Sequence, residues 1–312
     1  MPPSSPSRAR GREPLAAKVP EITAMFWAVK ILTTGMGEAA ADFLAHISLV
    51  LAAGLGVVGF VVGLALQFRA ARYTAPVYWF AVMMVAVFGT MAADGPPIGH
   101  LGSMFFYIAV LAGVLHYWHR SEGTLSIHSI VTRRRETLYW LTVVTTFALG
   151  TAAGDVTADT LRLGYLGSGL LFAAAILVPL VGWRLGLNEV VAFWLAYILT
   201  RPLGASFADW LGKPSSKSGV GLGDGAVAAV ATVLIVAFVA YLTVTRGDIQ
   251  RPATPEPHRP DGGAAGHGIP SPATQGRRSP DRGIPAHGAA DPSATVPLAT
   301  GPRSRRGPVP SE

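Results

Sequence analysis

The sequence predicts an all-α integral membrane protein with eight transmembrane helices, arranged as four parallel two-helix repeats. Composition is the first ground for this prediction. Half of the 312 residues are hydrophobic, 14% are charged, and the mean hydropathy is +0.41 although both ends of the chain are polar. Such a composition is typical of a membrane protein rather than a soluble globule. The second ground is a motif that recurs four times along the apolar middle of the chain.

The motif is a tryptophan, nine residues, a glycine, four residues and an aspartate, with an aromatic residue before each tryptophan. Its four copies contain no insertion or deletion, and a fixed spacing of this kind indicates a repeated structural unit. Each unit reads as a motif helix, a short turn and a plainer helix that returns across the membrane. Because two crossings restore the direction of the chain, all four motif helices are expected to run parallel. The copies are Phe26, Trp27, Gly37 and Asp42; Tyr78, Trp79, Gly89 and Asp94; Tyr139, Trp140, Gly150 and Asp155; and Phe193, Trp194, Gly204 and Asp209.

Eight apolar runs are each long enough to cross a bilayer core of ~30 Å as a helix of about 20 residues. Backbone polar groups must be satisfied within lipid, and the runs are too long and too evenly apolar for barrel strands, so we expect a helical bundle. The runs lie near 21–44, 47–68, 76–94, 99–119, 137–158, 162–183, 189–211 and 222–245. They form a membrane domain at 20–246, with repeats at about 21–69, 74–120, 136–184 and 189–246.

The two ends of the chain read as disordered tails. Residues 1–19 form a basic arm, and residues 247–312 form a tail rich in proline, glycine and arginine that cannot bury a core.

Basic residues concentrate after every second apolar run, and loops rich in Lys and Arg stay in the cytoplasm. Both termini are therefore expected in the cytoplasm, on a multi-pass protein of the cytoplasmic (inner) membrane. These basic residues are Arg69, Arg72, Arg120, Arg133, Arg134, Arg135, Arg184 and Arg246.

Composition and motifs exclude several classes of function. The chain has no cysteine, which excludes disulfides, thiolate metal sites and cysteine nucleophiles. Its net charge of +7 resides mostly in tails and short loops, so we expect the lipid bilayer rather than nucleic acid as its partner. No nucleotide-binding, metalloprotease or serine-hydrolase motif occurs. We therefore expect neither an enzyme nor a cofactor.

Three charged residues, Lys30, Glu38 and Arg201, lie inside apolar runs of the first and fourth repeats. A charge there costs at least ~2.5 kcal/mol and usually has a partner or a pathway. On parallel helices Glu38 and Arg201 differ in depth by about 6 Å. If the bundle closes with those two repeats side by side, we expect an ion pair between them. The pair could be structural, or it could belong to a gate or a proton-coupled site.

The four motif aspartates, Asp42, Asp94, Asp155 and Asp209, would form an acidic ring at the outer end if the motif helices share a centre. Such a ring attracts cations, whereas the alternative is that each aspartate caps a turn at the membrane surface. Candidate metal ligands beside the ring are His46 and His100, which could instead be interfacial histidines, and Asp159, which could share a cation with Asp155. Threonines at similar heights could line a polar path or bond back to their own helix. The motif tryptophans and glycines are expected to pack the helices, since small residues allow close approach in lipid.

The stretch from Val19 to Leu44, VPEITAMFWAVKILTTGMGEAAADFL, resembles the first repeat of a bacterial multi-pass family of "membrane-anchored" proteins. That family is built from a repeated membrane domain of unknown function, usually in four copies. The later repeats resemble it through their Trp, Gly and Asp, over roughly residues 19–245. The resemblance implies the architecture and no particular activity. The matching residues are Val19, Pro20, Glu21, Phe26, Trp27, Lys30, Thr33, Gly37, Glu38 and Asp42.

Two classes of function follow from these features. The first is a secondary transporter or permease for a cation or small polar solute, with Lys30, Glu38 and Arg201 inside the bundle and the aspartate ring at its outer mouth. The second is a membrane scaffold or accessory protein, in which the motif serves packing and the tail recruits partners. A membrane enzyme is a third class with less support. The oligomeric state stays open.

Overall fold

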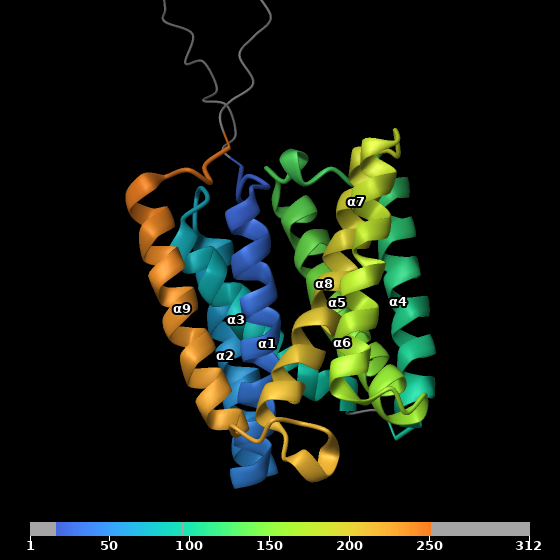
Figure 1. The fold of residues 1–312 in the computed structure, drawn as a ribbon. Helices are drawn as coiled ribbons and strands as arrows, with labels where there is room; N and C mark the ends of the chain where they lie inside the picture. The colour runs from blue at the N-terminus through green and yellow to red at the C-terminus, as the bar shows by residue number, and fades with distance from the viewer. Residues whose placement is uncertain (1–16, 95–96, 251–312) are drawn as a thin grey trace, which may run out of the picture. The chain divides into compact units, whose positions relative to one another are not determined.

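The computed structural model describes residues 17–94 and 97–250, so most of both predicted tails lies outside it. Within these ranges the chain is all-helical, as predicted, and contains no strand. Short helical turns at Ile127–Ser129, Val156–Thr160 and Ser215–Lys217 join longer helices. The longer helices, shown in Figure 1, are α1 (Ala24–Ile47), α2 (Leu49–Arg69), α3 (Ala75–Asp94), α4 (Gly99–Glu122), α5 (Arg133–Asp155), α6 (Gly164–Ala175), α7 (Leu177–Arg184), α8 (Glu189–Gly212) and α9 (Asp224–Thr245).

Seven helical stretches of the described chain are long and apolar enough to cross a membrane, with α6 and α7 together forming one of them. The protein is therefore a multi-pass helical membrane protein. Helix α1 is not among the seven, although it has 24 residues. Its sequence contains Lys30, Glu38 and Asp42, which lower its hydropathy. The eighth predicted crossing is thus α1, which carries two of the three charges that the sequence places inside the membrane, Lys30 and Glu38.

The four helices that carry the motif form a closed ring. Helix α1 packs against α3, α3 against α5, α5 against α8, and α8 against α1. Each remaining long helix packs on the outside of one of them: α2 on α3, α4 on α5, α6 on α8 and α9 on α1. The outer helices expose large apolar side chains, as expected for surfaces that face lipid. Examples are Val50 on α2, Phe105 on α4, Val178 on α7 and Val233 on α9.

Helices α6 and α7 are one apolar run divided by a proline. Pro179 has no backbone N–H to donate to the carbonyl of Ala175, and its ring crowds that carbonyl. The first helix accordingly ends at Ala175 and the second begins at Leu177. Ile176 lies at the break, with its N–H bonded to the carbonyl of Phe172. The result is a short separate helix, α7, beside the start of α8.

The described part of the chain extends beyond the predicted membrane domain at both ends. Lys18, within the predicted arm, is buried and donates to Glu136 Oε2 at 2.6 Å. Asp248, within the predicted tail, is also buried and accepts a hydrogen bond from the Tyr73 hydroxyl. The start of α1 and the end of α9 lie together at this end of the bundle, which we call the terminal end (Figure 1). The opposite end, where α1 finishes and α9 begins, is the far end.

Candidate functional site

An aromatic layer fills the bundle toward the terminal end. The aromatic residue before each motif tryptophan contacts the tryptophan of the next ring helix. Tyr78 and Tyr139, from two neighbouring helices, also share a hydrogen bond between their hydroxyls. The predicted packing role of the tryptophans therefore takes the form of a cyclic set of ring contacts. The ring centroids are 5.7 Å apart for Phe26 and Trp79, 5.7 Å for Tyr78 and Trp140, 6.4 Å for Tyr139 and Trp194, and 5.8 Å for Phe193 and Trp27.

The motif glycines form a second cyclic set nearer the far end. Each glycine faces the residue that lies three positions before the glycine of the next ring helix. A Cβ on Gly37, for example, would lie 2.8 Å from the backbone carbon of Ala86. The helices approach this closely because glycine has no side chain, which is the packing expected of the motif glycines. The facing pairs are Gly37 with Ala86, Gly89 with Phe147, Gly150 with Arg201, and Gly204 with Thr34.

Arg201 lies at the centre of the glycine layer and is fully buried. Its Nη2 atom is 2.8 Å from Glu38 Oε2, so the ion pair predicted between the first and fourth repeats is present. The guanidinium also donates from Nη1 to the carbonyl of Thr34 at 2.7 Å and from Nε to that of Phe147 at 3.4 Å. A buried pair of charges is tolerated when further hydrogen bonds satisfy both groups, and this one meets that condition.

Two threonines that the sequence did not single out complete this network. Thr90 and Thr151 each donate to Glu38 Oε2 at 3.2 Å and accept from Arg201 Nη2. Both occupy the position directly after a motif glycine, which is the position that Glu38 occupies in its own helix. Comparing the residue directly after the motif glycine in each repeat would have identified both threonines as candidates for this network. Each of the four ring helices, α1, α3, α5 and α8, thus contributes a side chain to the network around this one ion pair.

The threonines that the sequence did single out mostly serve their own helices. Their hydroxyls donate to carbonyls three or four residues earlier, which is the second of the two predicted readings. Thr34 also reaches across to the carbonyl of Thr200 at 3.3 Å. These threonines are Thr33, Thr34, Thr145, Thr146 and Thr200.

Lys30 is a buried lysine that lies against two aromatic rings. It is 1% exposed, and its Nζ has no hydrogen-bond partner within the described residues. It lies 4.2 Å from the ring centroid of Phe147 and 4.3 Å from that of Tyr197. Arg201 lies over the same Phe147 ring at 5.0 Å. Attraction to the two ring faces offsets part of the cost of burying the ammonium.

Lys30→Met is expected to raise the stability of the protein by about 1 kcal/mol or more. Methionine fills a similar volume but removes a buried cation whose compensation comes from ring contacts. The measurement is thermal unfolding of the purified protein in detergent, with Lys217→Met, at an exposed position, as the control. A variant less stable than the native protein would show that the charge of Lys30 holds the fold together.

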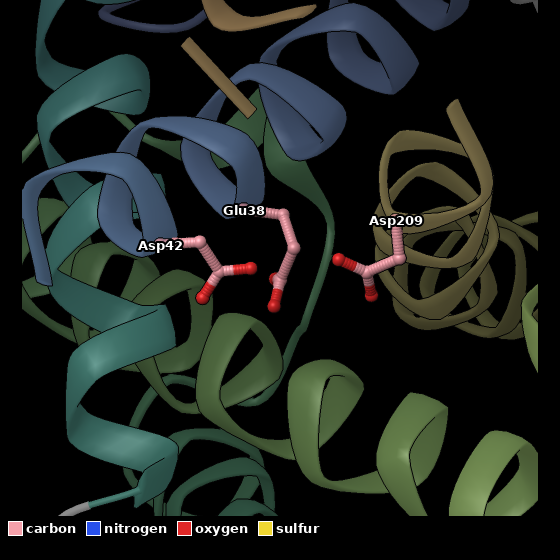
Figure 2. A group of neighbouring side chains, drawn as sticks. All are labelled: Glu38, Asp42 and Asp209. Carbon is pink, nitrogen blue, oxygen red and sulfur yellow. The ribbon is translucent and has the colours of Figure 1, made fainter. Parts of the chain in front are cut away.

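Glu38 of the ion pair also belongs to a cluster of carboxylates that extends toward the far end. Glu38 and Asp42 come from α1 and Asp209 from α8, and one oxygen of each lies within 4.8 Å of the others. Figure 2 shows the three side chains directed toward one another across the gap between the two helices. We call these three residues the carboxylate cluster. Its ligand atoms are all oxygens, which suits a proton or a hard cation.

Lys213 supplies the counter-charge of this cluster. Its Nζ forms an ion pair with Asp42 and lies 3.3 Å from Asp224 and 3.9 Å from Asp209. Three carboxylates therefore share one ammonium, while Glu38 is paired with Arg201. Burial alone lowers the pKa of Lys213, but the neighbouring carboxylates, Asp42 foremost, raise that pKa above its ordinary value. Lys213 is accordingly a cation at neutral pH.

Two of the four aspartates of the predicted acidic ring belong to the cluster. Asp42 and Asp209 converge, whereas Asp155, the last residue of α5, is not a member of the cluster. The side chain of Asp94 lies outside the described part of the chain, so a ring of four stays a prediction.

The other candidate ligands lie outside the cluster as well. His46 is 71% exposed in its side chain, with Nδ1 2.8 Å from the carbonyl oxygen of Asp42 and 3.8 Å from the carboxylate of Asp224. His100 is exposed at the start of α4, and Asp159 is exposed in the turn after α5. Their role as metal ligands also stays a prediction.

Access to these charges increases toward the far end. The side chain of Arg201 is 0% exposed, that of Glu38 5%, that of Asp209 11% and that of Asp42 26%. Lys30, the Glu38–Arg201 pair and the carboxylate cluster thus follow one another along the bundle centre, and we call this series the charged column. Its terminal side is filled by the aromatic layer, and its far side is the more accessible one.

Comparison with known proteins identifies a repeat family. A family profile described as "Repeat of Unknown Function (DUF347)" matches residues 25–73, 138–185 and 192–248, which correspond to the first, third and fourth predicted repeats. No curated protein and no solved structure matches the chain. The second predicted repeat falls outside the matched ranges, yet its Trp79, Gly89 and Thr90 occupy the same layers as their counterparts. The chain therefore belongs to the family built from this repeat of unknown function, DUF347, as the resemblance of its first repeat indicates.

Proposed function

We propose that the chain is a secondary transporter of cations in which Glu38, Asp42 and Asp209 form the cation site. The observation that carries this proposal is the charged column along the bundle centre. Ionised groups inside a membrane protein are costly and usually mark a substrate, ion or proton pathway. The accessible end of the column holds the carboxylates, so a cation is the substrate that its charge favours.

In the proposed membrane arrangement the chain crosses the cytoplasmic membrane eight times as four parallel repeats. The motif helices α1, α3, α5 and α8 run in one direction, and α2, α4, the α6–α7 pair and α9 return. The same contacts recur at the same register around the ring, which supports parallel copies. The terminal end lies in the cytoplasm under the positive-inside rule, with Arg69, Arg72 and Arg184 among the residues that favour this orientation. The carboxylate cluster then faces the outside.

Lys213 has a defined part in the proposed mechanism. Its ammonium lies among the carboxylates that a substrate cation would contact, so the two compete for Asp42 and Asp209. Lys213 directly follows α8 in a loop rather than within a helix, which allows it to withdraw without breaking the ring. Exchange of the ammonium for a bound cation leaves the charge of the cluster nearly balanced. A proton or a small hard cation fits this exchange.

Reconstitution in liposomes tests the proposal. The purified protein is expected to carry at least one of H⁺, Na⁺, K⁺, Mg²⁺ and Mn²⁺, followed with a pH-sensitive dye or isotope uptake. Asp209→Asn should reduce that flux to the level of empty liposomes, because the site loses one of its three charged ligands. Glu122→Gln is the matched control, since Glu122 pairs with Arg134 and Arg135 at the end of α4 and lies outside the column.

Lys213→Gln sharpens the same experiment. Without its tethered competitor, the cluster should bind the substrate cation at a lower concentration than in the native protein. The proposal fails if the native protein carries none of the five cations, or if Asp209→Asn transports at the native rate.

A membrane scaffold is the second candidate function. It is favoured by the hydrogen bonds of the Glu38–Arg201 pair, since Thr34, Thr90 and Thr151 satisfy it within the protein and a structural pair needs nothing more. A folded protein that carries no flux in liposomes, and whose Asp209→Asn variant has native stability, would support this candidate.

A further inference from the structure

A pocket of about 480 Å³ lies beside the charged column, in the half of the bundle nearer the terminal end. Helices α1, α7 and α8 and the turn that contains His128 surround it. Its volume falls within the range of pockets that hold small organic ligands. Its walls are mostly apolar and include the aromatic side chains of Trp27, Trp183 and Phe193. None of the cluster carboxylates lines it.

The pocket arises from two local departures from the regular packing, one in each of its walls. The motif residues Trp79, Trp140 and Trp194 are buried, whereas Trp27 is partly exposed and borders the pocket. The opposite wall belongs to α7, the short helix created by the break before Pro179. The pocket therefore lies on the outer side of the seam where α8 meets α1.

Apart from His128, the titratable side chains that line the pocket are acidic. Glu21 and Glu189 line it, and no Lys or Arg is among the described residues that do so. His128 is the third titratable group of the lining, with Nε2 3.6 Å from Glu21 Oε1. Glu189 is exposed in the first turn of α8. An apolar interior with aromatic faces and carboxylates is complementary to a positively charged apolar molecule.

We propose that this pocket binds an amphipathic organic cation. The apolar body of the ligand packs against Trp27, Phe193 and the side chains of α7. Its positive group lies toward Glu21 and Glu189 and over the faces of the aromatic rings. The site is separate from the carboxylate cluster, and its ligand differs from the small hard cations considered above. Binding here does not require the protein to be a transporter.

Tetraphenylphosphonium and tetraphenylborate are a matched pair of probes, because they share shape and apolar surface but carry opposite charge. Equilibrium dialysis of the purified full chain in detergent measures the binding of each. We expect saturable binding of one tetraphenylphosphonium per chain and no saturable binding of tetraphenylborate. Equal binding of the two ions would overturn the proposal. Preferential binding of a neutral diacylglycerol would assign the pocket to a lipid tail and overturn it as well.

Variants locate the site. Ala196→Phe places a ring inside the pocket and should abolish binding of tetraphenylphosphonium, since Ala196 is part of the lining. The double variant Glu21→Gln and Glu189→Gln should weaken binding roughly tenfold, because it removes both carboxylates and keeps their volume. Glu122→Gln, outside the pocket, should bind as the native protein does.

Thermal unfolding establishes whether each variant is folded. If Ala196→Phe does not fold, the affinity of the double glutamine variant alone determines whether the cation binds in the pocket. Native affinity in a folded Ala196→Phe protein, or in the double variant, would show that the cation binds elsewhere and would overturn the proposal. Asp209→Asn, which tests cation transport, should bind tetraphenylphosphonium normally, so the two proposals can fail separately.

Discussion

Replacing Arg201 with methionine is expected to lower the free energy of unfolding by about 3–5 kcal/mol. The substitution leaves the carboxylate of Glu38 inside the bundle without its cation. It also removes the donors to the carbonyls of Thr34 and Phe147 and to the hydroxyls of Thr90 and Thr151. Unfolding in mixed detergent and denaturant, followed by tryptophan fluorescence, measures the change.

A double variant separates the charge from the packing. Glu38→Leu combined with Arg201→Met removes both charges, so it should recover most of the stability that the single change loses. Arg72→Met, at an exposed position between α2 and α3, should behave as the native protein. The buried pair would not account for the loss of stability if Arg201→Met were as stable as the native protein. The same would follow if the double variant were no more stable than Arg201→Met alone.

Gly37→Ala is expected to destabilise the protein by roughly 1–3 kcal/mol, which is the usual effect of forcing extra volume into a packed core. The added Cβ would lie 2.8 Å from the backbone carbon and 3.1 Å from Cα of Ala86. Backbone atoms cannot rotate out of the way, so α1 and α3 must separate. Separation at one seam strains the neighbouring seams, because the ring of four helices is closed. Thermal unfolding in detergent measures the loss.

Gly54→Ala is the matched control for this change. Gly54 lies in α2, and a Cβ there would meet nothing within 4 Å. Alanine favours helix over glycine by roughly 0.8–1.0 kcal/mol, so this variant should be as stable as the native protein or more so. Equal stability of the Gly37 and Gly54 variants would contradict the close approach of α1 and α3.

The sequence predicted the helical class because hydropathy and repeat spacing act over long stretches. The pairing of Glu38 with Arg201 was also predictable, since helix geometry converts their positions in the motif into similar depths. Thr90 and Thr151 were missed because a threonine in an apolar helix most often bonds to its own backbone. Their position after the motif glycine carried the information, and it becomes visible when the helices are compared at one register.

Other parts of the site depend on conformations that a repeat does not encode. Lys213 reaches Asp42 and Asp209 because the chain after α8 stays packed against that helix, with the N–H of Val220 bonded to the carbonyl of Trp210. The identical motif position of four aspartates predicted a ring, but it did not specify which of them share a counter-charge. The side pocket likewise depends on the helix break before Pro179 and on the partial exposure of Trp27.

The meeting of the two ends of the described chain has a topological consequence. The N–H of Glu21 bonds to the carbonyl of Asp248 at 2.8 Å, and Gln250 Nε2 donates to the carbonyl of Pro20 at 3.2 Å. A ring of four helices has no obligatory first member, and here its last outer helix, α9, packs on its first inner one, α1. A circular permutation that joins these ends and opens the exposed connection at 185–188 would preserve each contact of the ring. The contacts of the ring thus do not require this particular starting point for the chain.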